Sequence, residues 1–321
     1  MAGIFWAVWD WLRNFFGNAF LIFVVVGIVL VLWKAIVFKR RAKAKRKADA
    51  AAAASDPNHK KHVAVITGAS SGMGEEFARQ LDRTEKDLDE IWLIARRQGR
   101  LEDIGEKLSH PVRVLALDLT DKASYEALTD ALDTDGVCVR WLIHCAGYAK
   151  IGNYAQISRA ESGRMVDLNC RAVVEVTTTV LPYMEAGSRV LLIASSAAFQ
   201  PIPYMNIYAS SKAFVYSYAR ALRAELFPRK IAVTASCPYW VRDTEFIGIA
   251  QETEEAAGDG RIVKNYLFGT TKDKVVRRSL KCSRAGLAVC TPGAFCFFHR
   301  LFSKVLSREF LIYFWEGLRR I

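Results

Sequence analysis

The stretch Val63-Ala-Val-Ile-Thr-Gly-Ala-Ser-Ser-Gly-Met-Gly74 decides the fold of this chain. Its first five residues are apolar or β-branched, as in a buried strand, and a helical pattern begins at Glu75. The intervening glycines permit positive φ angles and let a ligand approach the backbone closely. The free N–H groups and the dipole of a helix that begins there suit a pyrophosphate. The stretch therefore predicts a strand, a tight turn and a phosphate-binding helix N-terminus.

Apolar runs recur along the chain after this strand and are separated by stretches with helical periodicity. Alternating strands and helices predict a parallel sheet that is covered on both faces. We therefore expect an α/β fold, a Rossmann-type doubly wound parallel sheet that forms a single catalytic domain. Ligands of such sheets lie beyond the carboxyl ends of the strands, where Arg96, Asp118 and Ser195 fall here. The further predicted strands are Ile91–Ala95, Val112–Leu117, Trp141–His144, Val190–Ala194 and Ile231–Ala235.

A tyrosine and a lysine four residues apart, Tyr208 and Lys212, fall on the same face of a helix. A nearby cation favours the phenolate and lowers the tyrosine pKa from its usual value of ~10. Such a phenol can exchange a proton with an alcohol or a carbonyl oxygen. A surface tyrosine beside a solvated lysine is the plain alternative. The glycine turn and Ser195, thirteen residues before the tyrosine, favour the catalytic interpretation.

The segment at residues 61–286 resembles the classical short-chain dehydrogenase/reductase family, through the glycine turn, Ser195 and the Tyr208-x-x-x-Lys212 pair. The resemblance implies that Ser195 hydrogen-bonds the substrate carbonyl and that Tyr208 donates the proton. It implies that Lys212 lowers the tyrosine pKa and binds the nicotinamide ribose, and that Asn169 holds a proton-relay water. The hydride comes from the nicotinamide.

The position of the catalytic serine depends on the register of the segment that follows it. Pro201-Ile-Pro203 falls at the family's usual offset if Ser195 is catalytic, and Ser196 is the alternative. The chain also departs from the family pattern, because His144-Cys145-Ala146-Gly147 replaces Asn-Asn-Ala-Gly and Pro238-Tyr239 replaces Pro-Gly. Neither change removes a catalytic group. We expect Cys145 to be a small buried residue rather than a redox group.

Basic residues at the end of the second strand favour NADP(H). An acidic residue there would bind the ribose 2′-OH of NAD, whereas this strand ends in Ala95-Arg96-Arg97. A guanidinium meets phosphate bidentately, although Arg97 and Arg100 could simply begin a solvated helix. The resemblance places Asp118 at the adenine edge. The expected cofactor-binding residues are Gly68, Ser70, Ser71, Gly72, Met73, Gly74, Arg96, Arg97, Asp118, Ala146, Gly147, Tyr208, Lys212, Pro238 and Thr244.

A membrane anchor is predicted near the N-terminus, because residues 14–33 carry no formal charge and are dominated by Phe, Ile, Val and Leu. At ~1.5 Å per residue they span ~30 Å, the hydrocarbon thickness of a bilayer. We place the transmembrane helix at residues 19–38, after an aromatic interfacial segment at residues 1–18. A cleaved signal peptide is the alternative, but the positive block lies on the wrong side for it.

A basic linker at residues 39–60 follows the predicted anchor. Its block Lys39-Arg-Arg-Ala-Lys-Ala-Lys-Arg-Lys47 contributes seven positive charges to a net charge of +12. The positive-inside rule then predicts a single-pass membrane protein whose catalytic domain lies in the cytoplasm. Contact of the block with anionic lipid headgroups is a simpler account than nucleic-acid binding. We therefore expect a membrane, and no nucleic acid, among the partners.

The C-terminal tail, residues 287–321, is aromatic and basic. Arg300, Lys304 and Arg308 recur every four residues beside apolar side chains, an amphipathic pattern. It suits either a membrane surface or a helix docked on the substrate lobe with a solvated basic stripe. The seven cysteines are odd in number and include no C-x-x-C pair, so we expect no disulfide scaffold and no metal.

A lipophilic substrate is predicted from the apolar residues that would line the pocket. The expected substrate-binding residues are Ser195, Tyr204, Met205, Tyr239 and Trp240. An apolar cleft suits a steroid or an acyl chain. A membrane anchor, the Pro201-x-Pro203 run and the aromatic tail resemble the membrane-bound 17β-hydroxysteroid dehydrogenase and very-long-chain 3-oxoacyl-CoA reductase branch.

We thus expect an NADP(H)-dependent oxidoreductase that interconverts a carbonyl and a secondary alcohol on a hydroxysteroid-like molecule. A long-chain 3-oxoacyl-CoA or acyl carrier protein reductase is the alternative, and a non-catalytic, membrane-tethered NADP-binding protein is a third reading. Phe214, Tyr218 and Leu222 recur at helical spacing after Tyr208. They are either core or a homodimer face.

Overall fold

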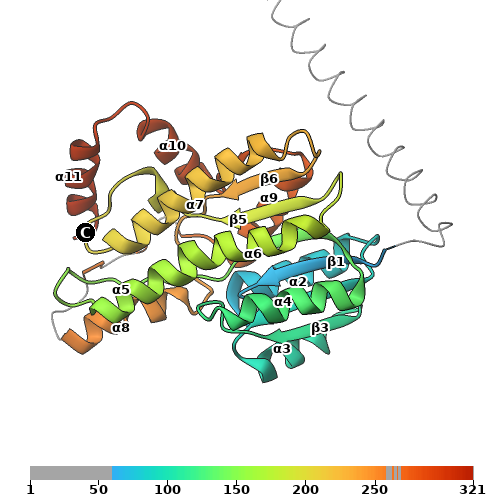
Figure 1. Ribbon diagram of the computed structural model, residues 1–321. Helices are drawn as coiled ribbons and strands as arrows, with labels where there is room; N and C mark the ends of the chain where they lie inside the picture. The colour runs from blue at the N-terminus through green and yellow to red at the C-terminus, as the bar shows by residue number, and fades with distance from the viewer. Residues whose placement is uncertain (1–59, 258–261, 264–265, 267–268, 321) are drawn as a thin grey trace, which may run out of the picture. The chain divides into compact units, whose positions relative to one another are not determined.

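In the part of the chain that the structure describes, seven parallel strands form one sheet in the order β3-β2-β1-β4-β5-β6-β7 (Figure 1). The computed structural model describes residues 60–257, 262–263, 266 and 269–320. The predicted interfacial segment, the anchor and nearly all of the basic linker lie outside these residues. The strands are β1 His62–Thr67, β2 Glu90–Ala95, β3 Val112–Ala116, β4 Cys138–His144, β5 Arg189–Ile193, β6 Ala232–Ser236 and β7 Val289–Cys290.

Helices connect the strands and continue after the last one. The α-helices are α2 Gly72–Thr84, α3 Gln98–Gly105, α4 Ala123–Asp135, α5 Arg159–Val166, α6 Ala172–Val180, α7 Asn206–Glu225, α8 Phe246–Ala257, α9 Lys272–Arg284, α10 Ala294–Phe302 and α11 Arg308–Leu318. Three short helices are the π-helix η1 Asp167–Arg171 and the 3-10 helices η2 Leu181–Tyr183 and η3 Ser196–Phe199. The sequence prediction of an α/β fold with a doubly wound parallel sheet is confirmed.

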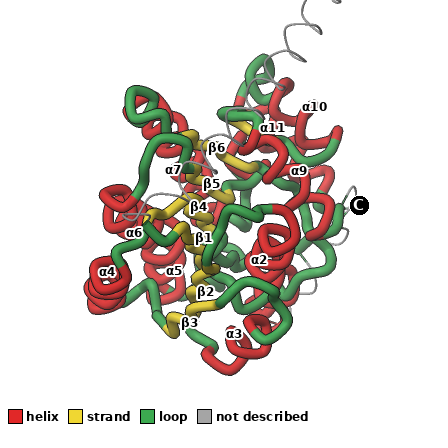
Figure 2. The backbone as a smooth tube through the Cα atoms, turned by 90° about the vertical axis from the view of Figure 1, so that its right-hand side faces the viewer, coloured by secondary structure: helices red, strands yellow, loops and turns green. Residues whose placement is uncertain are grey.

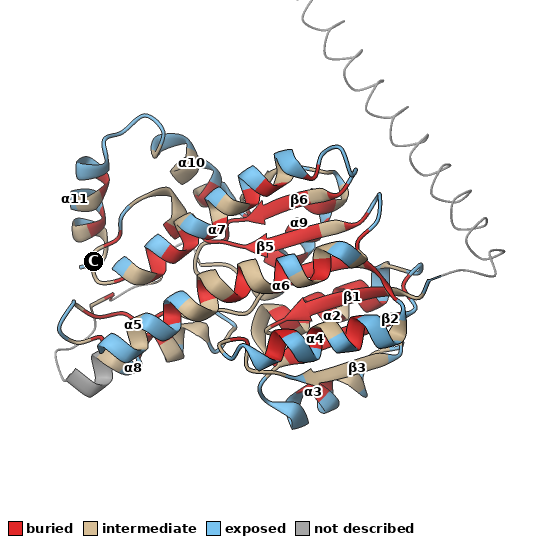
Figure 3. Cartoon of the chain, in the orientation of Figure 1, coloured by how far each residue is buried: buried red, intermediate tan, exposed pale blue. Residues whose placement is uncertain are grey.

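The sheet lies between two layers of helices, as Figure 2 shows edge-on, with α2, α3 and α9 on one face and α4 to α7 on the other. Alternate residues of a strand point to opposite faces. Val63 and Val65 of β1 therefore belong to the core beneath α4, α6 and α7, whereas Ala64 and Ile66 belong to the core beneath α2, α3 and α9. Figure 3 shows the strands buried between the layers. Each fully buried Val, Leu or Ile side chain contributes about 1.5–3 kcal/mol relative to an exposed one.

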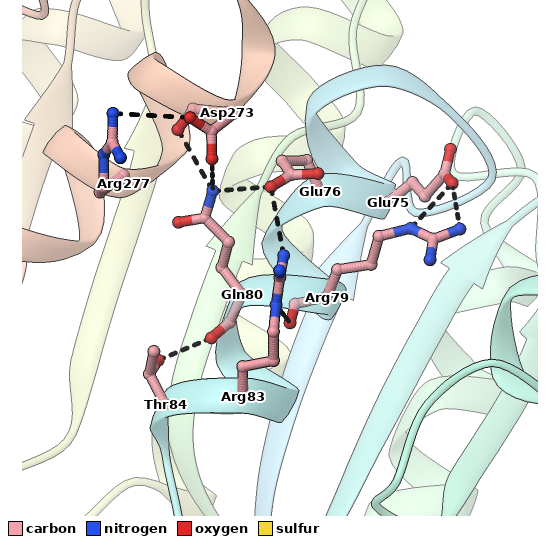
Figure 4. A network of polar contacts seen from close by, with 8 residues as sticks. All are labelled: Glu75, Glu76, Arg79, Gln80, Arg83, Thr84, Asp273 and Arg277. Carbon is pink, nitrogen blue, oxygen red and sulfur yellow. Dashed lines mark hydrogen bonds and ion pairs between the residues drawn. The ribbon is translucent and has the colours of Figure 1, made fainter.

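A polar network joins α2 to α9 on the face of the sheet that α2, α3 and α9 cover (Figure 4). Gln80 Nε2 donates to Glu76 Oε1 at 2.6 Å and to the backbone carbonyl and side chain of Asp273 at 3.2 Å. At the C-terminal ends of the two helices, Arg284 Nε donates to Glu85 Oε1 at 2.7 Å. These bonds satisfy polar groups that are largely removed from water, and they hold α2, the helix that follows the glycine turn.

The parallel register aligns the carboxyl ends of the central strands. Thr67, the last residue of β1, is opposite Ile94 of β2 and His144 of β4. His144 is in turn opposite Leu192 of β5. The turns that follow these strands therefore lie side by side along one edge of the sheet, as the sequence predicted.

The chain after the predicted domain boundary at Gly286 continues the same fold. The two-residue strand β7 pairs with β6 through Ser236 and Cys290. Sequence periodicity missed β7 because two residues are too few to show a pattern. Residues 60–321 form one compact unit that includes α10 and α11. Within the described residues, no helix combines the length and apolar character needed to cross a bilayer.

Candidate active site

A cavity of about 930 Å³ lies at the aligned carboxyl ends of the strands. It receives the glycine turn after β1, Arg96 after β2, Asp118 after β3, Cys145 after β4 and Ser195 after β5. All of the predicted cofactor-binding residues line it. One concave site thus collects residues that are more than a hundred positions apart in the sequence.

The glycine turn after β1 is packed so closely that side chains cannot be added to it. Gly68 has a φ of +67°, and a Cβ atom there would lie 2.6 Å from the Ala146 nitrogen. A Cβ atom on Gly74 would lie 2.1 Å from the Gly68 carbonyl oxygen. Thr67 Oγ1 accepts hydrogen bonds from the N–H groups of Cys145 and Ala146, each at 3.2 Å, and so ties the two turns together. The backbone beside the first turn of α2 therefore carries no side chains at these glycines, and this surface fits the pyrophosphate of a dinucleotide.

Ser195, Tyr208 and Lys212 lie together at the middle of the cavity. Tyr208 and Lys212 come from successive turns of α7, and Lys212 Nζ lies 5.8 Å from the centre of the tyrosine ring. Lys212 Nζ donates to the Ile193 carbonyl at 2.9 Å. Ser195 Oγ donates to the Pro238 carbonyl at 3.5 Å and accepts from the Ala197 N–H at 3.1 Å.

The structure separates Ser195 from its neighbour. Ser195 forms the N-cap of η3, where its side chain accepts from the Ala197 N–H. Ser196 is buried as well, but its backbone N–H donates to the Pro238 carbonyl at 2.8 Å. Of the two serines, Ser195 is the one whose side chain lowers the pKa of Tyr208, which favours it as the candidate.

Burial sets the proton affinities of this group. Removal from water raises the pKa of Tyr208 to about 12, although the hydrogen bond with Ser195 acts in the opposite direction. Removal from water lowers the pKa of Lys212 to about 8. The sequence predicted a tyrosine pKa lowered by Lys212, and the structure differs because burial dominates and the ammonium is bonded to Ile193.

Asn169 lies behind this group, in the π-helix η1 between α5 and α6. Its side chain is fully buried and is held by donation from Nδ2 to the Tyr148 carbonyl at 2.9 Å and to Ser211 Oγ at 3.1 Å. Its Oδ1 accepts from the Tyr148 N–H at 3.1 Å. The amide therefore fixes the loop after β4 against α7, one residue from Lys212. Single-turn π-helices are frequent at functional sites.

The two arginines after β2 take different positions. Arg97 donates to Ser70 and Ser71 of the glycine turn, at 3.0 and 2.9 Å, and forms an ion pair with Glu245 at 3.0 Å. Arg96 lines the cavity. Burial raises the pKa of Asp118, but hydrogen bonds from Thr120, with a smaller effect of the Arg96 charge, hold it below its usual value. Asp118 is thus a carboxylate.

Glu245 joins the chain after β6 to the adenosine side of the cavity. Its carboxylate pairs with Arg97 at 3.0 Å and with Arg100 at 2.5 Å. The bonds from Arg100 and Arg97 outweigh partial burial and lower its pKa. The two arginines are therefore not simply solvated, because both pair with Glu245 next to the glycine turn.

Aromatic and apolar side chains form the other half of the cavity. Met205, Tyr239 and Trp240 line it as predicted, together with Phe246 of α8. Tyr204 does not line the cavity. It has a φ of +65°, and its ring lies 4.2 Å beneath the Arg319 guanidinium at the end of α11. This turn directs Tyr204 to the C-terminal tail instead.

His144 and Cys145, which depart from the family pattern, are both inert. Burial lowers the pKa of His144 to about 3, and its Nε2 lies 2.9 Å from Thr177 Oγ1. Burial raises the pKa of Cys145 to about 12, so the thiol stays protonated near neutral pH. Cys145 was expected to be buried, but it is half-buried in the cavity wall; its protonated thiol agrees with the prediction that it is not a redox group.

A family model described as short chain dehydrogenase matches residues 62–255. The chain belongs to the short-chain dehydrogenase family. Sulfoacetaldehyde reductase 2 of Chromohalobacter salexigens is 33% identical over 206 residues, 61% of this chain and 79% of the relative. The 17-beta-hydroxysteroid dehydrogenase type 3 of Mus musculus is 27% identical over 255 residues, 76% of this chain and 75% of the relative.

A solved short-chain dehydrogenase from Sphingobium yanoikuyae, in complex with NADPH, superposes with a TM-score of 0.64. It is 27% identical, and the match covers 78% of this chain and 94% of that one. The present short-chain dehydrogenase is therefore a nicotinamide-dependent oxidoreductase.

Sequence reasoning missed three parts of the site in this short-chain dehydrogenase. Glu245 was missed because its partners lie about 150 positions earlier. Gln200 and His299 line the substrate half as a polar pair, with His299 Nε2 2.7 Å from Gln200 Oε1. The C-terminal tail also lines the cavity, through Phe298, Phe302, Leu306, Phe310, Leu311, Phe314, Trp315 and Leu318. The aromatic content of the tail was the available signal, and it was interpreted as a membrane surface or as a helix docked on the substrate lobe, without the prediction that it lines the cavity.

Proposed function

We propose that this short-chain dehydrogenase uses NADP(H) to interconvert a carbonyl and a secondary alcohol on a lipophilic, hydroxysteroid-like molecule. The observation that carries the proposal is the division of the cavity. The Ser195–Tyr208–Lys212 group lies where the backbone cradle meets an aromatic half, which suits a ligand with one reacting oxygen and a large apolar body.

Tyr208 is the proposed general acid in the direction of reduction. With a pKa of about 12 it is protonated at neutral pH and can donate to the carbonyl oxygen as negative charge develops there. Ser195, which lines the same cavity, would donate a second hydrogen bond to the same oxygen and orient it. When bound, the nicotinamide supplies the hydride.

Lys212 and Asn169 support the tyrosine in this proposal. The Lys212 ammonium is positioned by the Ile193 carbonyl and would bind the ribose hydroxyls while stabilising a developing phenolate. Asn169 holds the loop after β4, and its part in a water relay stays a prediction.

A preference for NADP(H) over NAD(H) is supported by the charges after β2. Arg96 lines the cavity without a neighbouring acidic residue at its own strand end, and Arg97 contacts Ser70 and Ser71 beside it. A guanidinium binds a 2′-phosphate through charge-assisted hydrogen bonds.

The test of the substrate class is NADPH consumption by the full chain in detergent micelles. A panel of ketosteroids is compared with long-chain 3-oxoacyl-CoA thioesters and with sulfoacetaldehyde as a small polar carbonyl, and Tyr208→Phe serves as the blank. Turnover of ketosteroids above the other two supports the proposal. Turnover of thioesters alone makes the chain a 3-oxoacyl reductase, and preference for the small carbonyl rejects a lipophilic substrate.

A further inference from the structure

The C-terminal helices carry an unusual concentration of exposed apolar side chains. Of the fourteen large hydrophobic side chains that are exposed within the described residues, nine lie between Phe297 and Phe314. Val305 is 78% exposed and Tyr313 is 77% exposed. We call these nine side chains the α10–α11 surface. Soluble monomers rarely expose a contiguous apolar patch of this kind unless it binds something.

This surface is the outer side of helices that are themselves docked on the domain. Cys296 of α10 and both Leu311 and Trp315 of α11 are buried, and Trp315 Nε1 donates to the Pro203 carbonyl at 3.3 Å. Figure 3 shows exposed residues along the outer side of both helices. Docking on the substrate lobe therefore leaves an apolar face uncovered, so the two readings of the tail are compatible.

The cavity opens at the same surface. Phe302, Phe310 and Phe314 line the cavity and are nevertheless more than half exposed, at 51%, 53% and 57%. A side chain can line the cavity and be exposed to solvent at the same time only at the edge of the cavity. The mouth of the substrate half is thus rimmed by the apolar side chains of α10 and α11.

Positive charges accompany the apolar residues. Lys304 and Arg308 are exposed and Arg300 is half-buried, whereas Glu309 is the only acidic residue between Gly293 and Trp315. Two copies of this surface facing each other would bring like charges together, which disfavours self-association. Aromatic and aliphatic side chains beside Lys and Arg fit the headgroup boundary of an anionic bilayer.

We propose that the α10–α11 surface docks on an anionic lipid bilayer and places the cavity mouth at the membrane, so that the substrate enters from the lipid. The docking is independent of the proposed function. The entry route rests on the proposed function, because only a substrate that partitions into lipid benefits from a cavity mouth at the membrane.

The docking is tested with the full chain reconstituted into phosphatidylcholine and phosphatidylserine vesicles. A polarity-sensitive fluorophore is placed on a cysteine at Val305 or Tyr313, and at Phe227 as the control, which is matched at 76% exposure but lies in the turn after α7. The native cysteines are buried or half-buried, and a labelled parent chain corrects for them. The chains labelled at Val305, Tyr313 and Phe227 all keep the N-terminal segment. The predicted anchor therefore cannot cause a difference between their labels.

Docking predicts that lipid-borne nitroxide quenches the labels at Val305 and Tyr313 while aqueous iodide does not, and that the Phe227 label behaves in the opposite way. Equal access of iodide to all three labels would overturn the proposal. Shielding of Val305 and Tyr313 in detergent micelles, without nitroxide quenching in vesicles, would also overturn it and indicate a protein partner or a second copy.

The entry route is tested with the double variant Val305→Glu, Tyr313→Glu, because neither residue lines the cavity. We expect the KM for a lipid-partitioned ketone in vesicles to rise about tenfold as lost apolar contact weakens docking, with unchanged kinetics for a short water-soluble ketone. Phe227→Glu is the control. If nitroxide quenches the labels but the KM of the double variant is unchanged, the entry route is overturned and the docking stands. Absence of turnover with any lipophilic ketone would reject the proposed function and leave the docking result intact.

Discussion

Lys212 Nζ donates a hydrogen bond to the backbone carbonyl of Ile193, 2.9 Å away, and thereby stands over the edge of the sheet beside Tyr208. The bond ties helix α7 to the end of β5. It fixes the ammonium at a point that a flexible surface lysine would not occupy, and it leaves the remaining N–H groups available to a ligand.

The buried position of Lys212 predicts a pH dependence. Burial lowers the pKa of Lys212 to about 8, so the ammonium is present below that pH and is lost as the pH rises through it. We expect kcat/KM for NADPH, which reports the free enzyme, to fall above about pH 8. The Tyr208 pKa of about 12 places the tyrosine outside this range.

The control is Lys212→Arg, whose charge does not titrate in the range. Its activity is expected to be lower but flat between neutral pH and the alkaline limit of stability. The same alkaline fall in the arginine variant would show that another group titrates.

Arg96 is predicted to select the cofactor. Arg96→Ala removes a charged hydrogen-bond donor to the 2′-phosphate, an interaction of about 1.5–3 kcal/mol, or roughly 10–100-fold in affinity. We expect the Kd for NADPH to rise by that factor and the Kd for NADH to change little, as measured by cofactor fluorescence. Arg277→Ala is the control, because Arg277 is an exposed arginine of α9 that does not line the cavity. Equal losses for both cofactors in Arg96→Ala would reject the phosphate role.

His299 is predicted to recognise a second polar group on the substrate. Burial lowers its pKa to about 4, so the ring is neutral at pH 7. Its Nε2 faces Gln200 Oε1, and its Nδ1 is buried and has no hydrogen-bond partner among the residues that the structure describes. An Nε2–H tautomer leaves Nδ1 as an acceptor, which suits a substrate hydroxyl.

The measurement compares a ketosteroid that carries a remote hydroxyl with the same ketone lacking it. The native chain is expected to favour the hydroxylated ketone by about tenfold in kcat/KM, and His299→Phe to lose that preference without losing turnover of the plain ketone. A preference that survives in His299→Phe would exclude this role.

Gly74 and Gly99 form a matched pair for stability. A Cβ atom on Gly74 would lie 2.1 Å from the Gly68 carbonyl oxygen, whereas one on Gly99 would meet nothing within 4 Å. Gly74→Ala is expected to reduce the free energy of unfolding by about 1–3 kcal/mol through overpacking. Gly99→Ala, in α3, should raise it by about 0.5–1 kcal/mol. Denaturant unfolding in detergent micelles checks both, and equal effects would contradict the close packing of the turn.

The sequence predicted the sheet and the centre of the site because both depend on local patterns. Six of the seven described strands are mainly apolar runs, and β7 is too short to show one. Tyr208 and Lys212 lie on one helical face by spacing alone. In a parallel sheet the strand ends meet at one edge, so residues as distant as Gly68 and Ser195 could be brought together without a structure.

The rest of the site depends on contacts between distant segments. Glu245 reaches Arg97 across the cavity, and His299 meets Gln200 only because α10 folds back onto η3. Tyr204 was expected in the pocket, but its positive φ angle directs the ring to Arg319. The tyrosine pKa differs from expectation for a similar reason, since spacing gives the neighbour but not the depth of burial.

Tyr208→Phe tests the central claim most directly. The full chain in detergent micelles is mixed with NADPH and a ketosteroid that the native chain reduces, and single-turnover NADPH oxidation is recorded beside NADPH binding. Loss of the proton donor is expected to slow oxidation by about 10²–10⁴-fold, with the NADPH affinity within about twofold of native because the ring lacks only its hydroxyl. Retention of near-native turnover by Tyr208→Phe, with NADPH bound, would contradict the account.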